Sequence, residues 1–164
     1  MFHICVAPLL AVLVLVGGSA EPVRRHCQIP CGIYGDKMRV AMILEDAATI
    51  EKGMMMIGEL SKESPVNYNQ LVRWVQNKDT HAQAIQDNVA AYWLAQRVKT
   101  PKPGEMPDKY FGQLVLMHGI TVAAMKCKQT TDPAHVATLR EKAQAFSATY
   151  FSEEDLKHLR EHAK

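Results

Sequence analysis

The chain has 164 residues, of which 48% are hydrophobic and 22% are charged, and its formal net charge at pH 7 is +2. This composition is that of an ordinary globular domain, and it excludes a disordered chain or a membrane protein with several spans. The weak positive excess forms no basic stripe, so we expect no nucleic-acid partner.

The chain begins with a segment typical of a signal peptide. Residues 5–16 form an apolar run, and the small residues Gly17-Gly18-Ser19-Ala20 follow it, which predicts cleavage after Ala20. The run is too short to span a bilayer comfortably. The pattern favours an exported, periplasmic or secreted protein with no membrane contact after processing. Because Met1-Phe2-His3 carries no Lys or Arg, the alternatives are an uncleaved anchor or another kind of pro-segment. A cytoplasmic location is the alternative to export.

A second processing signal precedes His26. Arg24-Arg25 is the kind of dibasic site that a trypsin-like protease cleaves, and a cut between Arg25 and His26 exposes a new α-amine. We therefore expect residues 1–25 to be removed as a signal and pro-segment.

The next nine residues, 26–34, read His-Cys-Gln-Ile-Pro-Cys-Gly-Ile-Tyr. Their proline and glycine favour a tight turn that brings two sulfurs and one imidazole together. With His26 as the first residue, its amine and the Cys27 amide nitrogen join the sulfurs of Cys27 and Cys31 as donors. Planar nitrogen and sulfur ligands suit Ni(II) or Cu(II), and the His26 imidazole can approach from an axial side.

Two other interpretations of this stretch remain open. Exported proteins commonly pair neighbouring cysteines, so Cys27 and Cys31 could form a structural disulfide in a non-enzymatic helical bundle. A copper-binding carrier could use the same donors. The lone Cys127 lies in a predicted helix and is expected to be a structural thiol.

Apolar residues at spacings of three and four predict helices in the remainder of the chain. The first runs from Asp36 to a break at Ser64-Pro65, and the second from about Asn67 to Val98, with Lys78 interrupting its apolar stripe. After a loop at residues 100–104, three further helices open near Pro107-Asp108, Thr131-Asp132-Pro133 and Ser152.

No stretch alternates as a strand, so we predict an all-α fold. The expected architecture is an antiparallel four-helix bundle formed by residues 35–164, preceded by the metal-binding hook at residues 26–34. We expect the nine methionines to fill the core. The scattered histidines on the helices are expected to be surface or hydrogen-bonded residues rather than ligands: His81, His118, His135, His158 and His162.

The motif His-Cys-x-x-Pro-Cys-Gly-x-Tyr resembles the nickel hook of the nickel superoxide dismutases. All its fixed positions are present between His26 and Tyr34, and the likeness extends to about residue 100. The resemblance implies an enzyme that converts superoxide to dioxygen and hydrogen peroxide through a Ni(II)/Ni(III) cycle. It implies one nickel per subunit, held by His26, Cys27 and Cys31, in a right-handed four-helix bundle assembled as a homohexamer.

The resemblance also assigns roles around the metal. Tyr34 matches the tyrosine that gates access to the nickel, and Pro30 is expected to have a cis peptide bond. The position after Cys27 is commonly acidic in the family, whereas this chain has Gln28. In some members a carboxylate and an arginine hold the axial imidazole. The candidates here are Arg39, Glu45 and Arg73.

Overall fold

The structure is a computed structural model that describes residues 35–162, without the side chains of His158, Arg160, Glu161 and His162. Across those residues it contains helices and no strand. In chain order they are α1 (Asp36–Leu60), α2 (Tyr68–Asp87), η1 (Asn88–Arg97), α3 (Asp108–Gln129), α4 (Ala134–Tyr150) and α5 (Glu153–His162).

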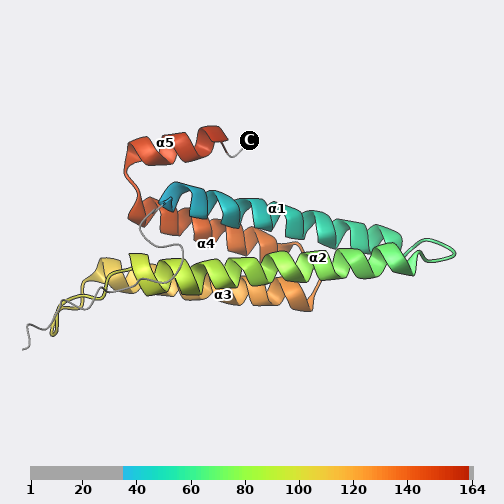
Figure 1. The fold of residues 1–164 in the computed structure, drawn as a ribbon, viewed down its shortest axis with the longest axis horizontal. Coiled ribbons are helices and arrows are strands. Elements are labelled where there is room, and N and C mark those ends of the chain that lie inside the picture. The colour runs from blue at the N-terminus through green and yellow to red at the C-terminus, as the bar shows by residue number, and fades with distance from the viewer. Residues whose placement is uncertain (1–34, 163–164) are drawn as a thin grey trace, which may run out of the picture.

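Four long helical segments lie side by side, and consecutive ones run in opposite directions (Figure 1). Helix α1 packs mainly on α2, and α3 packs mainly on α4, while α2–α3 and α1–α4 contacts close the bundle. The short helix α5 lies against α1, where Lys37 and Asp155 form an ion pair of 3.0 Å. The predicted all-helical bundle is therefore confirmed for the described part of the chain.

The apolar stripes identified from spacing form the core. On α1, Val40, Ile43, Ala47, Ile50 and Met54 are buried. The other helices bury the matching positions: Ala82, Ile85, Val89, Tyr92, Met117, Ala124, Val136, Leu139, Ala143 and Phe146. None of the helices in the described part is both long and apolar enough to cross a membrane, and the apolar run of residues 5–16 lies outside that part.

Lys78 does more than interrupt an apolar stripe. Its side chain is only 3% exposed, and its ammonium group donates to the carbonyl oxygens of Cys127 (2.7 Å) and Lys128 (2.8 Å). These carbonyls belong to the last turn of α3, where four carbonyl groups have no partner within the helix. Asp79 completes the contacts of the ammonium group at 2.7 Å. Lys78 therefore caps α3 from α2.

The predicted helix over residues 67–98 changes type at Asn88. From Asn88 to Arg97 the backbone forms a π-helix, in which hydrogen bonds join residues five apart; the bond from the Val98 N–H to the Trp93 carbonyl closes it. Residues five apart then lie on one face. This register places Tyr92 and Arg97 together, and it buries Asn88, Trp93 and Val98.

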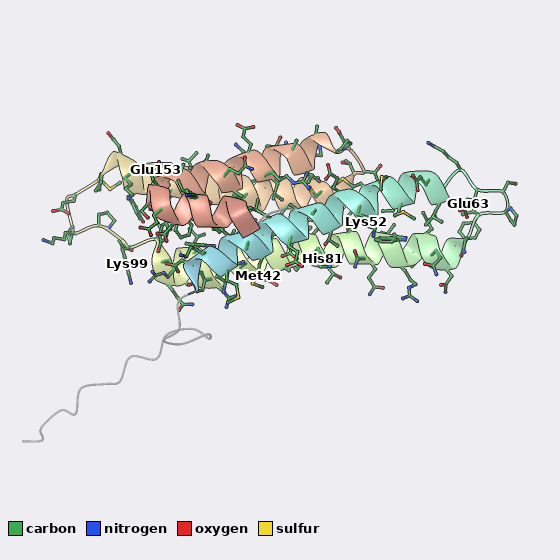
Figure 2. All side chains as sticks on the ribbon, turned by 90° about the horizontal axis from the view of Figure 1, so that it is seen from above. Met42, Lys52, Glu63, His81, Lys99 and Glu153 are labelled. Atoms are coloured by element: carbon green, nitrogen blue, oxygen red, sulfur yellow. The ribbon has the colours of Figure 1, made fainter. Side chains whose placement is uncertain are left out.

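The methionine prediction is wrong for most of the described methionines. Met54 and Met117 are in the core, but five others have side chains that are 40% exposed or more: Met38, Met42, Met55, Met106 and Met125. Met42 lies on the outer surface of α1 (Figure 2). The prediction rested on the usual role of methionine as core filler. It fails for these residues because the flexible, unbranched side chain is also accommodated on a helix surface.

Candidate metal centre

The described structure begins one residue after the predicted hook. His26, Cys27, Cys31 and Tyr34 all lie outside the described residues. Gly35 joins the hook directly to α1, whose first residue is Asp36. The contacts of this first turn of α1 are therefore the part of the site's surroundings that the structure describes.

Asp36 is held by three side chains that come from two other elements. Arg97, at the end of η1, donates from Nε at 2.8 Å and 3.1 Å to the two carboxylate oxygens, and from Nη2 at 2.6 Å. The hydroxyl of Tyr92 donates at 2.5 Å, and that of Tyr150, at the end of α4, donates at 2.9 Å. We call these four residues the Asp36 cluster. Bidentate, charge-assisted bonds of this kind fix a carboxylate firmly.

The cluster keeps Asp36 ionised and its tyrosines protonated. Burial alone would favour the neutral carboxyl, but the hydrogen bonds from Arg97, Tyr92 and Tyr150 outweigh it and hold the pKa of Asp36 below its usual value. Burial and the bond to Asp36 raise the pKa of Tyr150 to about 12, and the pKa of Tyr92 is raised for the same reasons. A carboxylate also suits the first turn of a helix, where the macrodipole is positive.

An aromatic wall backs the Asp36 cluster. The Trp93 ring, fully buried, packs edge-on against Tyr92, Phe146 and Tyr150, with centroid distances of 5.3, 4.9 and 5.1 Å. Phe151 covers Tyr150 at 5.1 Å. Edge-to-face contacts of this kind favour one arrangement of the rings. The end of the bundle nearest the hook is thus closely packed.

Of the three residues considered as partners of the axial imidazole, Arg39 lies nearest to the start of α1. Its guanidinium stacks over the Tyr92 ring at 4.8 Å, one helical turn from Asp36. Glu45 is about 14 Å farther along α1 than Asp36, given 1.5 Å per residue. Arg73 lies in the first turns of α2, at the opposite end of the bundle (Figure 1).

The described bundle offers no competing metal site. Residues 35–162 contain no cluster of three or more Cys, His, Asp or Glu side chains able to hold an ion. His81 is paired with Asp46 at 2.7 Å, as expected for a satisfied histidine (Figure 2). Cys127 is a free, buried thiol, and burial raises its pKa to about 11, which agrees with a structural role.

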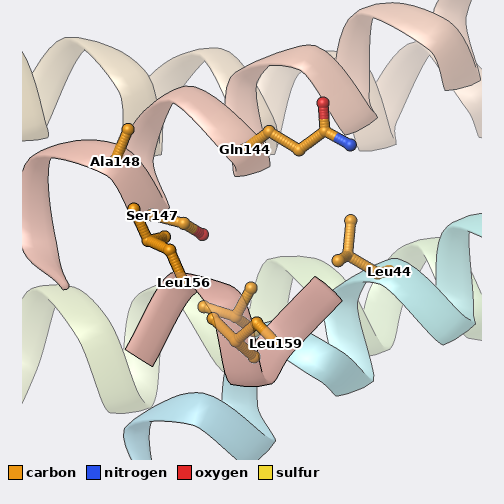
Figure 3. Close-up of a pocket in the computed structure, with 7 residues that line it drawn as sticks. Leu44, Gln144, Ser147, Ala148, Leu156 and Leu159 are labelled. Carbon is orange, nitrogen blue, oxygen red and sulfur yellow. The ribbon is translucent and has the colours of Figure 1, made fainter. Parts of the chain in front are cut away.

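A hollow of about 340 Å³ lies between α1, α4 and α5 (Figure 3). Leucines from α1 and α5 line it, and Gln144 and Ser147 are its polar side chains. It presents no metal ligand of the kinds found in the hook.

The chain matches a family of metal-dependent oxidoreductases. A sequence model of this family, described as nickel-containing superoxide dismutase, matches residues 21–154 and so spans both the hook and the bundle. The chain belongs to the nickel-containing superoxide dismutase family. It is accordingly an oxidoreductase with nickel as its cofactor, and it converts superoxide to dioxygen and hydrogen peroxide. No curated protein and no solved structure matched the chain.

The Asp36 cluster was not predicted from the sequence. Tyr92 and Tyr150 fitted the apolar stripes, and Asp36 was identified only as the start of a helix. One signal was present, because the hydroxyl of a core tyrosine needs a hydrogen-bond partner. The partner could not be identified from spacing, since Asp36 is 61 residues from Arg97 and 114 from Tyr150.

Proposed function

We propose that the nickel of this superoxide dismutase is held by residues 26–34. His26 would supply its α-amine and imidazole, Cys27 its amide nitrogen and thiolate, and Cys31 a second thiolate. The family match supports the proposal, because it includes this stretch. The absence of a rival cluster of ligands in residues 35–162 supports it further.

The donor set fits nickel chemically. Thiolate, imidazole and amine ligands are soft to borderline donors, which nickel accepts, whereas the hook lacks the fourth side chain that a closed zinc site would need. When bound, nickel supplies the one-electron cycling between Ni(II) and Ni(III) that dismutation needs, and the anionic thiolates favour the higher oxidation state.

Tyr34 and the Asp36 cluster are assigned different roles. Tyr34 is the proposed gate, which limits what reaches the metal and holds a small anion or water by its hydroxyl. Asp36 is a positioning residue two positions later. Its bonds to Arg97, Tyr92 and Tyr150 tie the first turn of α1 to η1 and α4. We propose that this fixed first turn positions the start of the bundle beside the hook in the chain.

Maturation precedes metal binding in this proposal. Removal of residues 1–20 during export, followed by a protease cut at Arg25-His26, frees the amine of His26. Before the second cut this nitrogen is part of a peptide bond, so the amine donor that the proposed site needs does not exist. The mature chain would act outside the cytoplasm, with a cytoplasmic enzyme as the alternative, and we propose that it assembles as a homohexamer.

The proposal is tested by substituting the two hook cysteines one at a time. Cys27→Ser and Cys31→Ser should each lose bound nickel, measured by elemental analysis, and dismutase activity, while circular dichroism shows unchanged helix content. Cys127→Ala is the matched control, because Cys127 is buried far along α3 and should keep nickel and activity.

Two results would overturn the ligand assignment. One is a Cys27→Ser or Cys31→Ser variant that keeps its full nickel content. The other is an active protein in which mass spectrometry finds the two sulfurs joined as a disulfide, two protons lighter than the dithiol. Bound copper without dismutase activity would instead support the carrier interpretation.

A further inference from the structure

A small basic groove lies between α3 and α4. Its volume is about 200 Å³, and four of its lining side chains can carry positive charge: His118 and Lys126 from α3, and His135 and Lys142 from α4. Thr138 adds a hydroxyl. No Asp or Glu belongs to the described lining. Apolar and small residues complete the walls.

These cationic groups are not neutralised by partners within the described structure. Several other cationic side chains of the bundle meet carboxylates: Lys37 pairs with Asp155, Arg97 with Asp36, and Arg140 with Glu51. For His118, Lys126, His135 and Lys142, no hydrogen bond or ion pair joins the side chain to any residue of the described part. Like charges gathered in one hollow repel one another unless an anion is present.

A glycine shapes the groove. A methyl group at Gly119 would come within 2.6 Å of Lys142 Cδ and 3.1 Å of its Cε, so the lysine stem lies directly across this position of α3. Only glycine leaves that space open. The half-buried stem of Lys142 therefore crosses from α4 to α3, which keeps its ammonium group beside the α3 residues of the groove.

The groove is distinct from the Asp36 cluster. Lys126 lies in the last turn of α3 and His135 in the first turn of α4, while Gly119 and Lys142 meet near the middle of the two helices. None of the groove's lining residues belongs to the Asp36 cluster.

We propose that this groove binds a phosphate-type oxyanion. When charged, lysine and histidine side chains offer N–H donors and no acceptors, and four such side chains lining one groove suit a tetrahedral dianion. A cation would be repelled by the same groups. The volume accepts a phosphoryl group but is small for the 300–1,000 Å³ sites that hold drug-sized ligands. The inference does not depend on the nickel assignment.

The binding test uses the mature, nickel-loaded protein at low ionic strength. Inorganic phosphate is titrated while the imidazole resonances of His118 and His135 are followed by NMR, with glycerol phosphate as a second arm. Saturable shifts of both histidines are expected. If inorganic phosphate binds at least as tightly as glycerol phosphate, the ligand is a free ion. If glycerol phosphate binds more tightly, the ligand is a phosphoryl group on a larger molecule. Shifts that do not saturate with either probe would overturn the proposal.

Charge-removing variants locate the site. Lys142→Gln and Lys126→Gln should each weaken phosphate binding about threefold to fivefold, in line with the worth of exposed ion pairs. Lys109→Gln is the control, because Lys109 is exposed on α3 and does not line the groove. Equal affinity in all three variants would place the phosphate elsewhere and contradict the inference.

A pair of glycine variants separates site geometry from helix stability. Gly119→Ala and Gly112→Ala both add helix propensity within α3, and Gly112 has open space where the methyl group would lie. Both should be at least as thermally stable as the parent. Only Gly119→Ala should weaken phosphate binding, because it displaces the Lys142 stem while keeping its charge. Unchanged binding in Gly119→Ala together with unchanged binding in Lys142→Gln would remove Lys142 from the site and overturn the proposal.

Discussion

At the scale of single residues, Asp36 makes the most consequential contacts. It lies two positions after Tyr34, and three side chains from η1 and α4 donate to its carboxylate. Its side chain is 16% exposed and that of Arg97 is 21% exposed, so water competes weakly for these bonds. These bonds fix the first turn of α1, which follows the proposed hook directly in the chain.

Asp36→Asn should lower the stability of the fold. The amide keeps the shape of the carboxyl group but leaves the Arg97 guanidinium without an anionic partner. We expect the free energy of unfolding at pH 7 to fall by about 2 kcal/mol, the range for hydrogen bonds to charged groups. Urea denaturation of the two proteins measures the difference, and a change below about 0.5 kcal/mol would mean that the cluster contributes little.

The difference in stability between the parent and Asp36→Asn should also depend on pH. The pKa of Asp36 in the folded protein is below its ordinary value of 3.8, so its ionised form stabilises the fold fully above that value. This contribution is lost as the pH falls through the folded-state pKa. The difference in unfolding free energy between the parent and Asp36→Asn should therefore narrow as the pH falls below 3.8. Glu51 and Asp155 titrate in both proteins, so their effects cancel.

At the scale of elements, Lys78 joins two helices, because it lies on α2 and caps the end of α3. Lys78→Met keeps the apolar stem and removes the ammonium group that binds the Cys127 and Lys128 carbonyls. We expect a loss of about 1–3 kcal/mol and faster amide hydrogen exchange in the last turn of α3. Lys99→Met, at an exposed position after η1, should change stability by less than about 0.5 kcal/mol. Equal effects of the two substitutions would refute the capping role.

The helices could largely be predicted from the sequence, because their apolar residues recur at three and four. The observed α1 begins at Asp36 and ends before Ser64-Pro65, as predicted. The loop after Val98 contains the prolines and glycine from which it was predicted. The change to a π-helix at Asn88 could not be predicted, since Val89 and Tyr92 continue the spacing of three and four from the preceding turns. Lys78 was identified only as an interruption, because spacing does not reveal which carbonyl a buried ammonium group will meet.

At the scale of the whole molecule, a helical bundle follows the proposed nickel hook in the chain. The ligand set of His26, Cys27 and Cys31 stays a prediction from ligand types at a characteristic spacing. The Asp36 cluster could not be predicted, because it joins residues far apart in the chain. The homohexamer and the exported location stay predictions that sedimentation and cell fractionation can examine.

The central claim is that a protease creates the metal ligand by exposing the amine of His26. Mass spectrometry of the active protein, under native and then denaturing conditions, tests it most directly. We predict a chain that begins at His26 and one nickel ion per chain in the native spectrum. A fully active, nickel-loaded chain that still begins at Glu21, or upstream of it, would contradict the account.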